Sequence, residues 1–305
     1  MQFSTFKIHS KNRLIQASLF LSMRSLVFAL SVICLSYGRA SDEEEFKMNQ
    51  AEAEKGDSEA QFLVGKAYTM GLGAPKDFKK AMEWYRKSAA QGNYKAQNNL
   101  GSMYYQGVGV AANPVEAAKW YRLAAEGGAG MSQMSLATML LQGKEIPKDA
   151  KEAEKWLRKA GAMGMVSAQA KLGSLYFFGD QIDRNFDEAA NWLTKAADGG
   201  DITSWNSLGV LYENGWGVTK DIPKALQLYR KAADVGDAKA KSNLGRCYSS
   251  GIGVERDLVK AYRWLVDGDR KGEITAKKML EELELEMTPA ERAEGKRLVE
   301  ELKLN

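Results

Sequence analysis

Apolar and small residues return along the chain at a fixed spacing of 36 positions. The stretch LGSMYYQGVGV at residues 100–110 comes back in nearly the same form as LGVLYENGWGV at 208–218, three such steps later. We use the word column for positions that lie 36 residues apart. One column reads Leu100, Leu136, Leu172, Leu208 and Leu244, and another reads Ala81, Ala117, Ala153, Ala189, Ala225 and Ala261. Self-similarity at this period predicts a repeat protein with six copies of one structural unit.

Glycine and short polar residues divide each copy into two helices. The first helix has a side chain that can cap its start at Asp57, Asn93, Asp201 and Asp237. It ends at the Gly71 column, where glycine takes a left-handed conformation at low cost. The second helix begins at the Asp/Asn column of Asp77 and ends at the Gly92 column. Glutamates three residues after three of these caps are predicted to complete capping boxes: Glu116, Glu152 and Glu188.

Helical spacing within each copy predicts the buried faces. In the first helix the leucine column forms a stripe with the Tyr68 and Ala60 columns, and in the second helix the Ala81 and Trp84 columns do the same. The Gly65 column lies inside the first helix, where glycine costs about 1 kcal/mol against alanine, so we expect it to mark close contact with a neighbouring helix. One hairpin cannot bury its apolar face alone, and neighbouring copies must therefore stack.

The repeated pattern resembles a known family. The consensus A-x-x-x-L-G-x-x-Y-x-x-G-x-G-V-x-x-D-x-x-K-A-x-x-W-Y-x-x-A-A-x-x-G is similar to the Sel1-like repeat, a relative of the tetratricopeptide repeat, and it runs from residue 57 to 272. The resemblance implies an all-α fold, a right-handed solenoid of six 36-residue helical hairpins with terminal capping helices. The chain departs from the pattern at Ala137, Glu145, Gln181 and Leu228.

The repeat pattern sets the expected organisation of the chain. A lead-in helix is expected within residues 41–56, and capping helices within 273–305, where Thr288, Pro289 and Glu291 form a helix start. The predicted repeats are residues 57–92, 93–128, 129–164, 165–200, 201–236 and 237–272.

The first forty residues have a different composition from the rest. They contain five basic residues and no acidic ones, and the segment from Met23 to Ala40 has a basic start, an apolar run and small residues at Gly38 and Ala40. This pattern is typical of a signal peptide cleaved after Ala40, with Met23 as a possible internal start. An uncleaved anchor is the alternative, but the apolar run is near ten residues against the about 20 that a spanning helix needs. We expect a periplasmic or secreted protein that meets the membrane only through this leader.

Removal of the leader changes the charge. Five of the 43 basic residues lie in it, so residues 41–305 carry 38 basic against 39 acidic side chains. A chain near neutrality with interspersed charges has no basic stripe for phosphates, and nucleic acid is therefore not an expected partner.

The same segment holds few groups for catalysis. It has no histidine and one cysteine, Cys247, whose column is apolar and which is therefore predicted to be buried. A Ser/His/Asp or Cys/His site cannot be assembled, and no metal site or cofactor is expected. Paired carboxylates could still make a hydrolase, but most acidic residues occupy caps or solvated positions. We therefore predict that the protein is not an enzyme.

The side of the first helix opposite the core varies from copy to copy. In a helical-hairpin solenoid the first helices line the concave side, the usual binding surface. We predict that a monomer binds a protein or peptide there through Phe62, Lys66, Tyr105, Met134, Leu141, Phe177, Phe178, Trp205, Val210 and Arg246. The alternative is that the bulky ones pack against the adjoining turns. By resemblance, such repeats serve as adaptors in bacterial envelopes or in host contact. A structural protein that binds peptidoglycan or polysaccharide, and a hydrolase acting on such material, are the competing functions.

Overall fold

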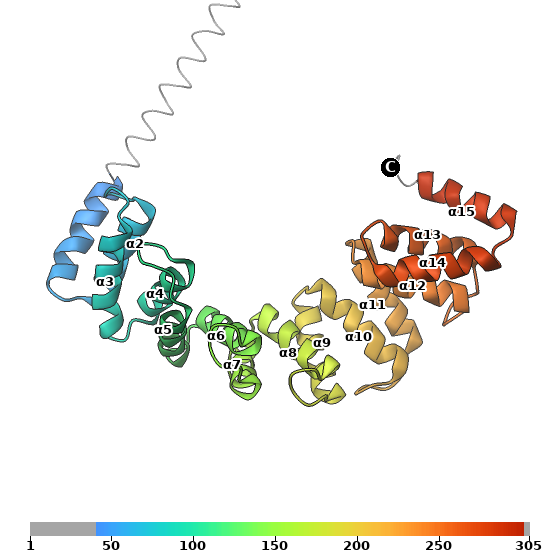
Figure 1. Ribbon diagram of the computed structural model, residues 1–305, viewed down its shortest axis with the longest axis horizontal. Helices are drawn as coiled ribbons and strands as arrows, with labels where there is room; N and C mark the ends of the chain where they lie inside the picture. The colour runs from blue at the N-terminus through green and yellow to red at the C-terminus, as the bar shows by residue number, and fades with distance from the viewer. Residues whose placement is uncertain (1–40, 302–305) are drawn as a thin grey trace, which may run out of the picture. The chain divides into compact units, whose positions relative to one another are not determined.

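The computed structural model describes residues 41–301, and every regular element in this range is an α-helix (Figure 1). The predicted export leader, residues 1–40, lies outside the described residues. Residues 41–54 form a helix ahead of the first repeat. None of the helices within 41–301 is long and apolar enough to cross a membrane.

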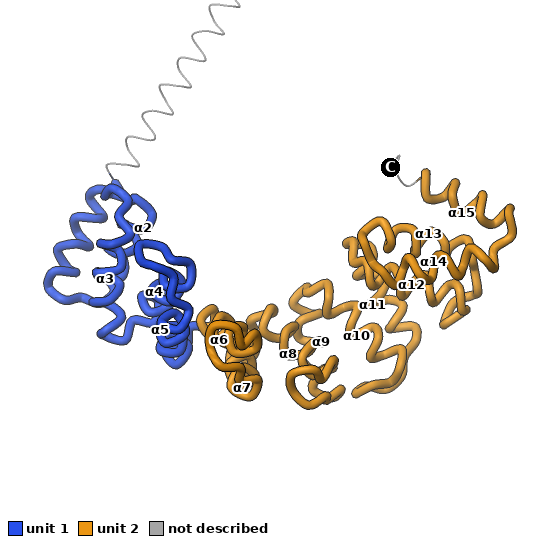
Figure 2. Tube along the Cα trace, in the orientation of Figure 1, with its two compact units in different colours: residues 1–129 blue, residues 130–305 orange. Residues whose placement is uncertain are grey.

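The chain divides into two compact units, residues 1–129 and 130–305, which we call the N-terminal and C-terminal units (Figure 2). Besides the helix of residues 41–54, the N-terminal unit contains α2 (Ser58–Met70), α3 (Phe78–Ala90), α4 (Tyr94–Gln106) and α5 (Pro114–Glu126). The C-terminal unit contains α6 (Gly130–Gln142), α7 (Ala150–Ala162), α8 (Val166–Phe178), α9 (Phe186–Asp198), α10 (Ile202–Asn214), α11 (Ile222–Asp234), α12 (Ala238–Ser250), α13 (Leu258–Asp269), α14 (Ile274–Glu286) and α15 (Pro289–Glu301).

Each repeat is a pair of antiparallel helices, as the sequence predicts. Within each unit the second helix of a repeat packs against its own first helix and against the first helix of the next repeat, as α9 does with α8 and α10. This double contact buries the apolar face that a lone hairpin would expose. At the end of the C-terminal unit, α14 and α15 both pack against α13 and enclose Leu283, Met287 and Val299 in the last core cluster.

Side-chain caps begin the helices at the predicted positions. Asp57 accepts from the backbone N–H of Ala60, and Asn93, Asp201 and Asp237 act in the same way. Every second helix of the six repeats has its Asp or Asn cap. Substitution of such a cap by alanine typically costs about 1 kcal/mol, so these columns are retained for stability.

The predicted capping boxes at Glu116, Glu152 and Glu188 are not formed, because the cap N–H is already used. The backbone N–H of Asp149 donates to the carbonyl of Leu140 in the preceding helix, and the corresponding bonds occur at Asn113 and Asn185. The Glu152 and Glu188 carboxylates instead accept from the indole N–H groups of Trp156 and Trp192. A true capping box is present at α15, where Thr288 and Glu291 exchange hydrogen bonds.

The Gly65 column marks the close helix contact that the sequence predicts. A methyl group added to Gly101 or Gly209 would lie within 2.7 Å of the ring of Tyr121 or Tyr229, in the second helix of the same repeat. These tyrosines belong to a buried column that the sequence analysis did not select: Tyr85, Tyr121, Leu157, Leu193, Tyr229 and Leu265. The two helices of a hairpin therefore pack through a large side chain of the second helix that lies against a glycine of the first helix. The Trp84 column lies next to this side chain in the sequence.

Candidate partner-binding surface

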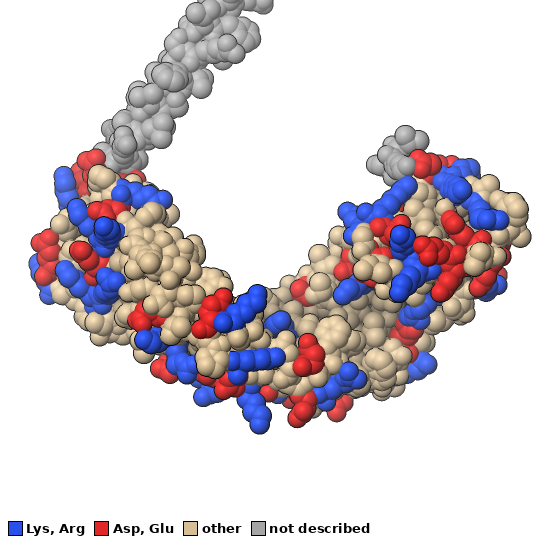
Figure 3. Space-filling view, viewed as in Figure 1, with Lys and Arg blue, Asp and Glu red and all other residues tan. Residues whose placement is uncertain are grey.

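The ten predicted binding residues fall into the two units, which we describe separately. We call the variable positions on the first helices the first-helix face; in the C-terminal unit it comprises Met134, Thr138, Leu141, Ala170, Ser174, Phe177, Asn206, Val210, Glu213, Ser242, Arg246 and Ser249. Lysine and arginine are interspersed with aspartate and glutamate on the side of each unit drawn in Figure 3. No cluster of His, Cys, Asp and Glu within residues 41–301 could hold a metal ion.

Three predicted residues lie in the N-terminal unit. Phe62 is half-buried and its ring lies 5.9 Å from that of Tyr85, with the Lys95 ammonium 5.6 Å above it. Tyr105 is exposed at the end of α4, as predicted. Lys66 is exposed and borders a small pocket between α2 and the helix of residues 41–54.

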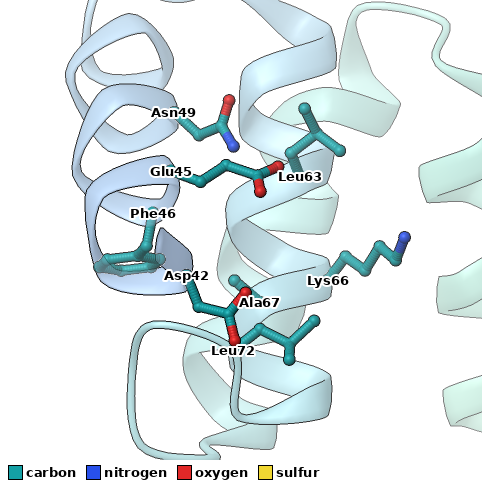
Figure 4. Close-up of a pocket in the computed structure, with 8 residues that line it drawn as sticks. All are labelled: Asp42, Glu45, Phe46, Asn49, Leu63, Lys66, Ala67 and Leu72. Atoms are coloured by element: carbon teal, nitrogen blue, oxygen red, sulfur yellow. The ribbon is translucent and has the colours of Figure 1, made fainter. Parts of the chain in front are cut away.

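That pocket is too small for an organic ligand. Its volume is about 70 Å³, and it is lined by Asp42, Glu45, Phe46, Asn49, Leu63, Lys66, Ala67 and Leu72. Figure 4 shows the Lys66 side chain directed away from Asp42 and Glu45. Pockets that hold organic ligands typically have volumes of about 300 to 1,000 Å³. We assign no ligand to it.

Apolar side chains line part of the first-helix face of the C-terminal unit. Met134, Phe177 and Val210, from α6, α8 and α10, are each half-buried, and the neighbouring Phe178 is 55% exposed. Ala170 and Ser174 on α8 are small residues of the same face. The arrangement offers apolar area that solvent can reach without opening the hairpins.

Leu141 and Trp205 are buried, with 7% and 9% of their surface exposed. The prediction that these two side chains face a partner is therefore wrong. The indole N–H of Trp205 donates to the carbonyl of Ala197 at 2.8 Å. Glutamines of the same column make the equivalent bond, as Gln169 does to Gly161 at 2.9 Å. Trp205 thus replaces a glutamine that closes the end of the preceding helix, which is a packing role. The burial of Leu141 agrees with the alternative that the bulky residues of this column pack within the protein rather than face a partner.

A polar network occupies the part of the first-helix face formed by α10 and α12. Arg246 pairs with Glu213 at 2.6 Å, and Glu213 also accepts from the hydroxyl of Tyr229 at 2.8 Å. Asn243 donates to Asn206 across the same two helices at 2.8 Å. Burial raises the pKa of the Glu213 carboxyl. The hydrogen bonds from Arg246 and Tyr229 and the positive charge of Arg246 outweigh this effect and hold the pKa below its ordinary value. The pair is therefore ionised, and part of the guanidinium remains open to solvent.

Cys247 is buried beside this network, as predicted. It is 1% exposed, and burial raises the pKa of its thiol to about 11. A protonated, inaccessible thiol is not a nucleophile at neutral pH. Cys247 therefore contributes to packing rather than to covalent chemistry.

One exposed aromatic residue that the sequence did not predict, Trp216, belongs to a chain of ring contacts. Trp216, in the turn after α10, stacks on Phe186 of α9 with ring centroids 4.9 Å apart and an interplanar angle of 15°. The Phe186 ring in turn meets Phe177 edge-on at 6.2 Å. The sequence does mark Trp216 as unusual, because no other repeat has an aromatic residue at this position. The column otherwise reads Leu72, Val108, Lys144, Asp180 and Ile252.

The model of the Sel1 repeat matches the chain six times, at residues 58–93, 95–128, 130–165, 166–201, 206–237 and 238–265. Together these matches cover well over half of the sequence.

The chain belongs to the Sel1 repeat family.

The helical hairpins described above are therefore the units of a Sel1 repeat α-solenoid, a protein-interaction type of scaffold that is generally non-catalytic. No curated protein matches the chain.

Solved structures agree with this fold. A protective antigen present in uropathogenic Escherichia coli strains is 31% identical with a TM-score of 0.67, and the match covers 85% of this chain. It spans 56% of the Escherichia coli protein, so this Sel1 repeat chain corresponds to little more than half of that relative. A Sel1 repeat protein from Oxalobacter formigenes is 33% identical with a TM-score of 0.58, and the match covers 79% of this chain and 96% of the other.

Proposed function

We propose that this Sel1 repeat protein is an exported, non-enzymatic adaptor that holds a segment of a partner protein against the first-helix face of its C-terminal unit. One observation carries the proposal. The columns that build the hairpins keep the same residue types, while Met134, Phe177 and Val210 place different half-buried apolar side chains on one face of successive first helices.

The energetics favour a peptide-sized contact. Burial of apolar surface contributes about 25 cal/mol per Å², so a partner that covers these side chains gains several kcal/mol. The Arg246 and Glu213 pair lies on the same face and is already ionised and hydrogen-bonded. It can orient a polar group of the partner without the cost of burying an unpaired charge.

Photo-crosslinking tests the location of the surface. A photoreactive amino acid is placed at Thr138 or Ser174 on the first-helix face, and at the exposed Asn191 or Gln227 on the second helices as matched controls. We expect a discrete adduct from the first pair that unlabelled protein competes away, and none from the second pair. Equal adducts from both pairs would remove the first-helix face as the binding surface.

Export rests on the pattern of residues 1–40 and is tested separately. The Escherichia coli relative is a protective antigen, which supports a place outside the cytoplasm for this chain as well. Fractionation of cells that express the full sequence, followed by N-terminal sequencing, should recover in the periplasm or the medium a chain that begins at Ser41. A cytoplasmic chain with an intact leader would contradict export and leave the binding proposal standing.

A second candidate function is binding of an envelope polysaccharide such as peptidoglycan. The observation that favours it is the exposed Trp216, 41% accessible, stacked on Phe186 in the C-terminal unit. Flat aromatic rings at a surface provide apolar faces on which a sugar ring can lie. Binding to insoluble peptidoglycan, compared between the protein and its Trp216→Ile variant, distinguishes this function from capture of a protein.

A further inference from the structure

Four aromatic rings are in continuous contact at one end of the hairpins in the C-terminal unit. We call Phe177, Phe178, Phe186 and Trp216 the aromatic shelf. Phe177 meets Phe178 edge-on at 5.0 Å and Phe186 at 6.2 Å, and Trp216 stacks on Phe186 at 4.9 Å. Phe178 and Trp216 are the exposed members. Residues of α8, α9 and the turn after α10 thus combine into one apolar patch.

The backbone holds the shelf in place. Trp216 lies between Gly215 and Gly217, both at positive φ, and a methyl group on Gly217 would lie 2.2 Å from the carbonyl oxygen of Phe186. The Arg184 guanidinium donates to the carbonyl of Phe178 at 2.9 Å and lies 5.7 Å from the centroid of the Phe186 ring. Rings fixed in this way lose little conformational entropy when a ligand covers them.

The charges around the shelf are mainly negative. The turns that flank it carry Asp180 and Asp183 before α9 and Asp221 before α11, and Asp187 follows in the first turn of α9. Arg184 and Lys220 are the cations of these turns, and Lys224 follows in the first turn of α11. Asp221 is engaged as a helix cap, whereas Asp180, Asp183 and Asp187 are not paired with any group in the described part of the chain.

We propose that the partner segment is cationic and amphipathic, and that the aromatic shelf is the anchor for its apolar and basic side chains. This inference rests on the proposed function and names the chemistry of the partner. Aromatic faces attract ammonium and guanidinium groups, and the unpaired carboxylates add attraction of the same sign. An acidic partner would meet repulsion from three carboxylates, and a neutral one would leave them without a counter-charge.

Synthetic peptides test the charge requirement on the purified full chain. A fluorescein-labelled peptide of alternating leucine and arginine is compared with one of leucine and glutamate and one of serine and arginine. We expect the first to bind at least about tenfold more tightly than the other two, because it offers both apolar side chains and positive charge. Raising NaCl from about 50 mM to about 500 mM should weaken binding of the leucine and arginine peptide, since exposed charges are screened.

Variants taken from other repeats test the site without loss of the fold. Trp216→Ile copies Ile252, Phe178→Gln copies Gln106, and Asp180→Lys with Asp187→Lys copies Lys144 and Lys151. Each should lower affinity for the leucine and arginine peptide about fivefold or more. The matched control is Met163→Ser, which removes an exposed apolar side chain of the same unit away from the shelf.

The outcomes separate this inference from the proposed function. Equal binding of the leucine and glutamate peptide, or an effect of Met163→Ser as large as that of Trp216→Ile, would overturn the inference. The inference would also be overturned if the protein bound soluble peptidoglycan fragments and this binding required Trp216 but did not weaken at higher NaCl concentration. In each case adducts from Thr138 and Ser174 would still support a protein adaptor, whereas their absence would contradict the adaptor and with it the inference that rests on it.

Discussion

The hydroxyl of Tyr176 in α8 accepts a hydrogen bond of 2.5 Å from the guanidinium of Arg158 in α7. The same hydroxyl donates to Glu154, and Arg158 also contacts Glu188 of α9 at 3.1 Å. Two other arginines make the same hydrogen bond to a tyrosine eighteen residues later in the chain, Arg86 to Tyr104 and Arg230 to Tyr248. A second helix is thus linked to the first helix of the next repeat by a polar bond as well as by packing.

Loss of this hydroxyl should weaken the contact between neighbouring repeats. Tyr176→Phe keeps the ring and removes one donor and one acceptor, so we expect a loss of about 1 kcal/mol in the free energy of unfolding. Urea unfolding of the two proteins measures it. Tyr105→Phe, which alters an exposed hydroxyl in the N-terminal unit, is the control. An equal effect of both changes would contradict a specific inter-repeat bond.

In the Gly65 column, replacement of glycine by alanine should lower the stability of the protein, which is the opposite of its usual effect in a helix. In an exposed helix, glycine to alanine stabilises by about 1 kcal/mol. At Gly209 the new methyl group would lie 2.6 Å from the ring of Tyr229, so we expect Gly209→Ala to destabilise by about 1 to 3 kcal/mol. The double variant Gly209→Ala with Tyr229→Leu, which copies the Ala137 and Leu157 pair of another repeat, should recover part of the loss. Thermal unfolding of the three proteins provides the measurement, and a stabilised Gly209→Ala would contradict the contact.

Trp205 should behave as a packing residue rather than as a contact to a partner. Trp205→Gln copies Gln169, keeps the donor to the preceding helix and loses apolar area, whereas Trp205→Ala loses both. We expect Trp205→Ala to cost about 3 kcal/mol or more and Trp205→Gln to cost less. Partner capture at a temperature where both variants are folded should match that of the parent protein. A variant of parental stability that no longer captures the partner would restore Trp205 to the binding surface.

The ion pair between Glu213 and Arg246 should make stability depend on pH. Because the folded-state pKa of Glu213 lies below its ordinary value of 4.5, the carboxylate contributes stability above pH 4.5, and this contribution is lost as the pH falls through the folded-state pKa. We therefore expect Glu213→Gln to be less stable than the parent at neutral pH, with a difference that narrows in acid. Urea unfolding across this range measures the difference. A gap that stays constant or widens in acid would contradict an ionised pair.

Much of this fold can be predicted from the sequence, because caps and glycines are local signals. Asp77 and Gly71 each act within a few residues of their own position, and a period of 36 repeats the signal. The depth of burial is different, since it depends on the neighbouring helix. Trp84 and Tyr85 are adjacent large residues on α3, and Tyr85, whose ring lies against Gly65, is the deeper one.

The binding surface is less predictable for a related reason. Variation within a column indicates that the contacts differ between repeats, but it does not show whether a side chain meets a partner or another helix. Tyr105, Leu141 and Phe177 share one column and are exposed, buried and half-buried. Trp216 belongs to a turn, where no helical or strand periodicity indicates which side chains meet, so its stacking on Phe186 does not follow from the repeat pattern.

Replacement of the apolar positions of the first-helix face tests the central claim most directly. The triple variant Met134→Asn, Phe177→Thr and Val210→Ser takes each new residue from the same column of another repeat, at Asn98, Thr69 and Ser102. With the photoreactive group at Ser174, we predict that the adduct yield falls about tenfold or more while the melting temperature changes by only a few degrees. An unchanged yield from a folded triple variant would contradict a partner-binding first-helix face.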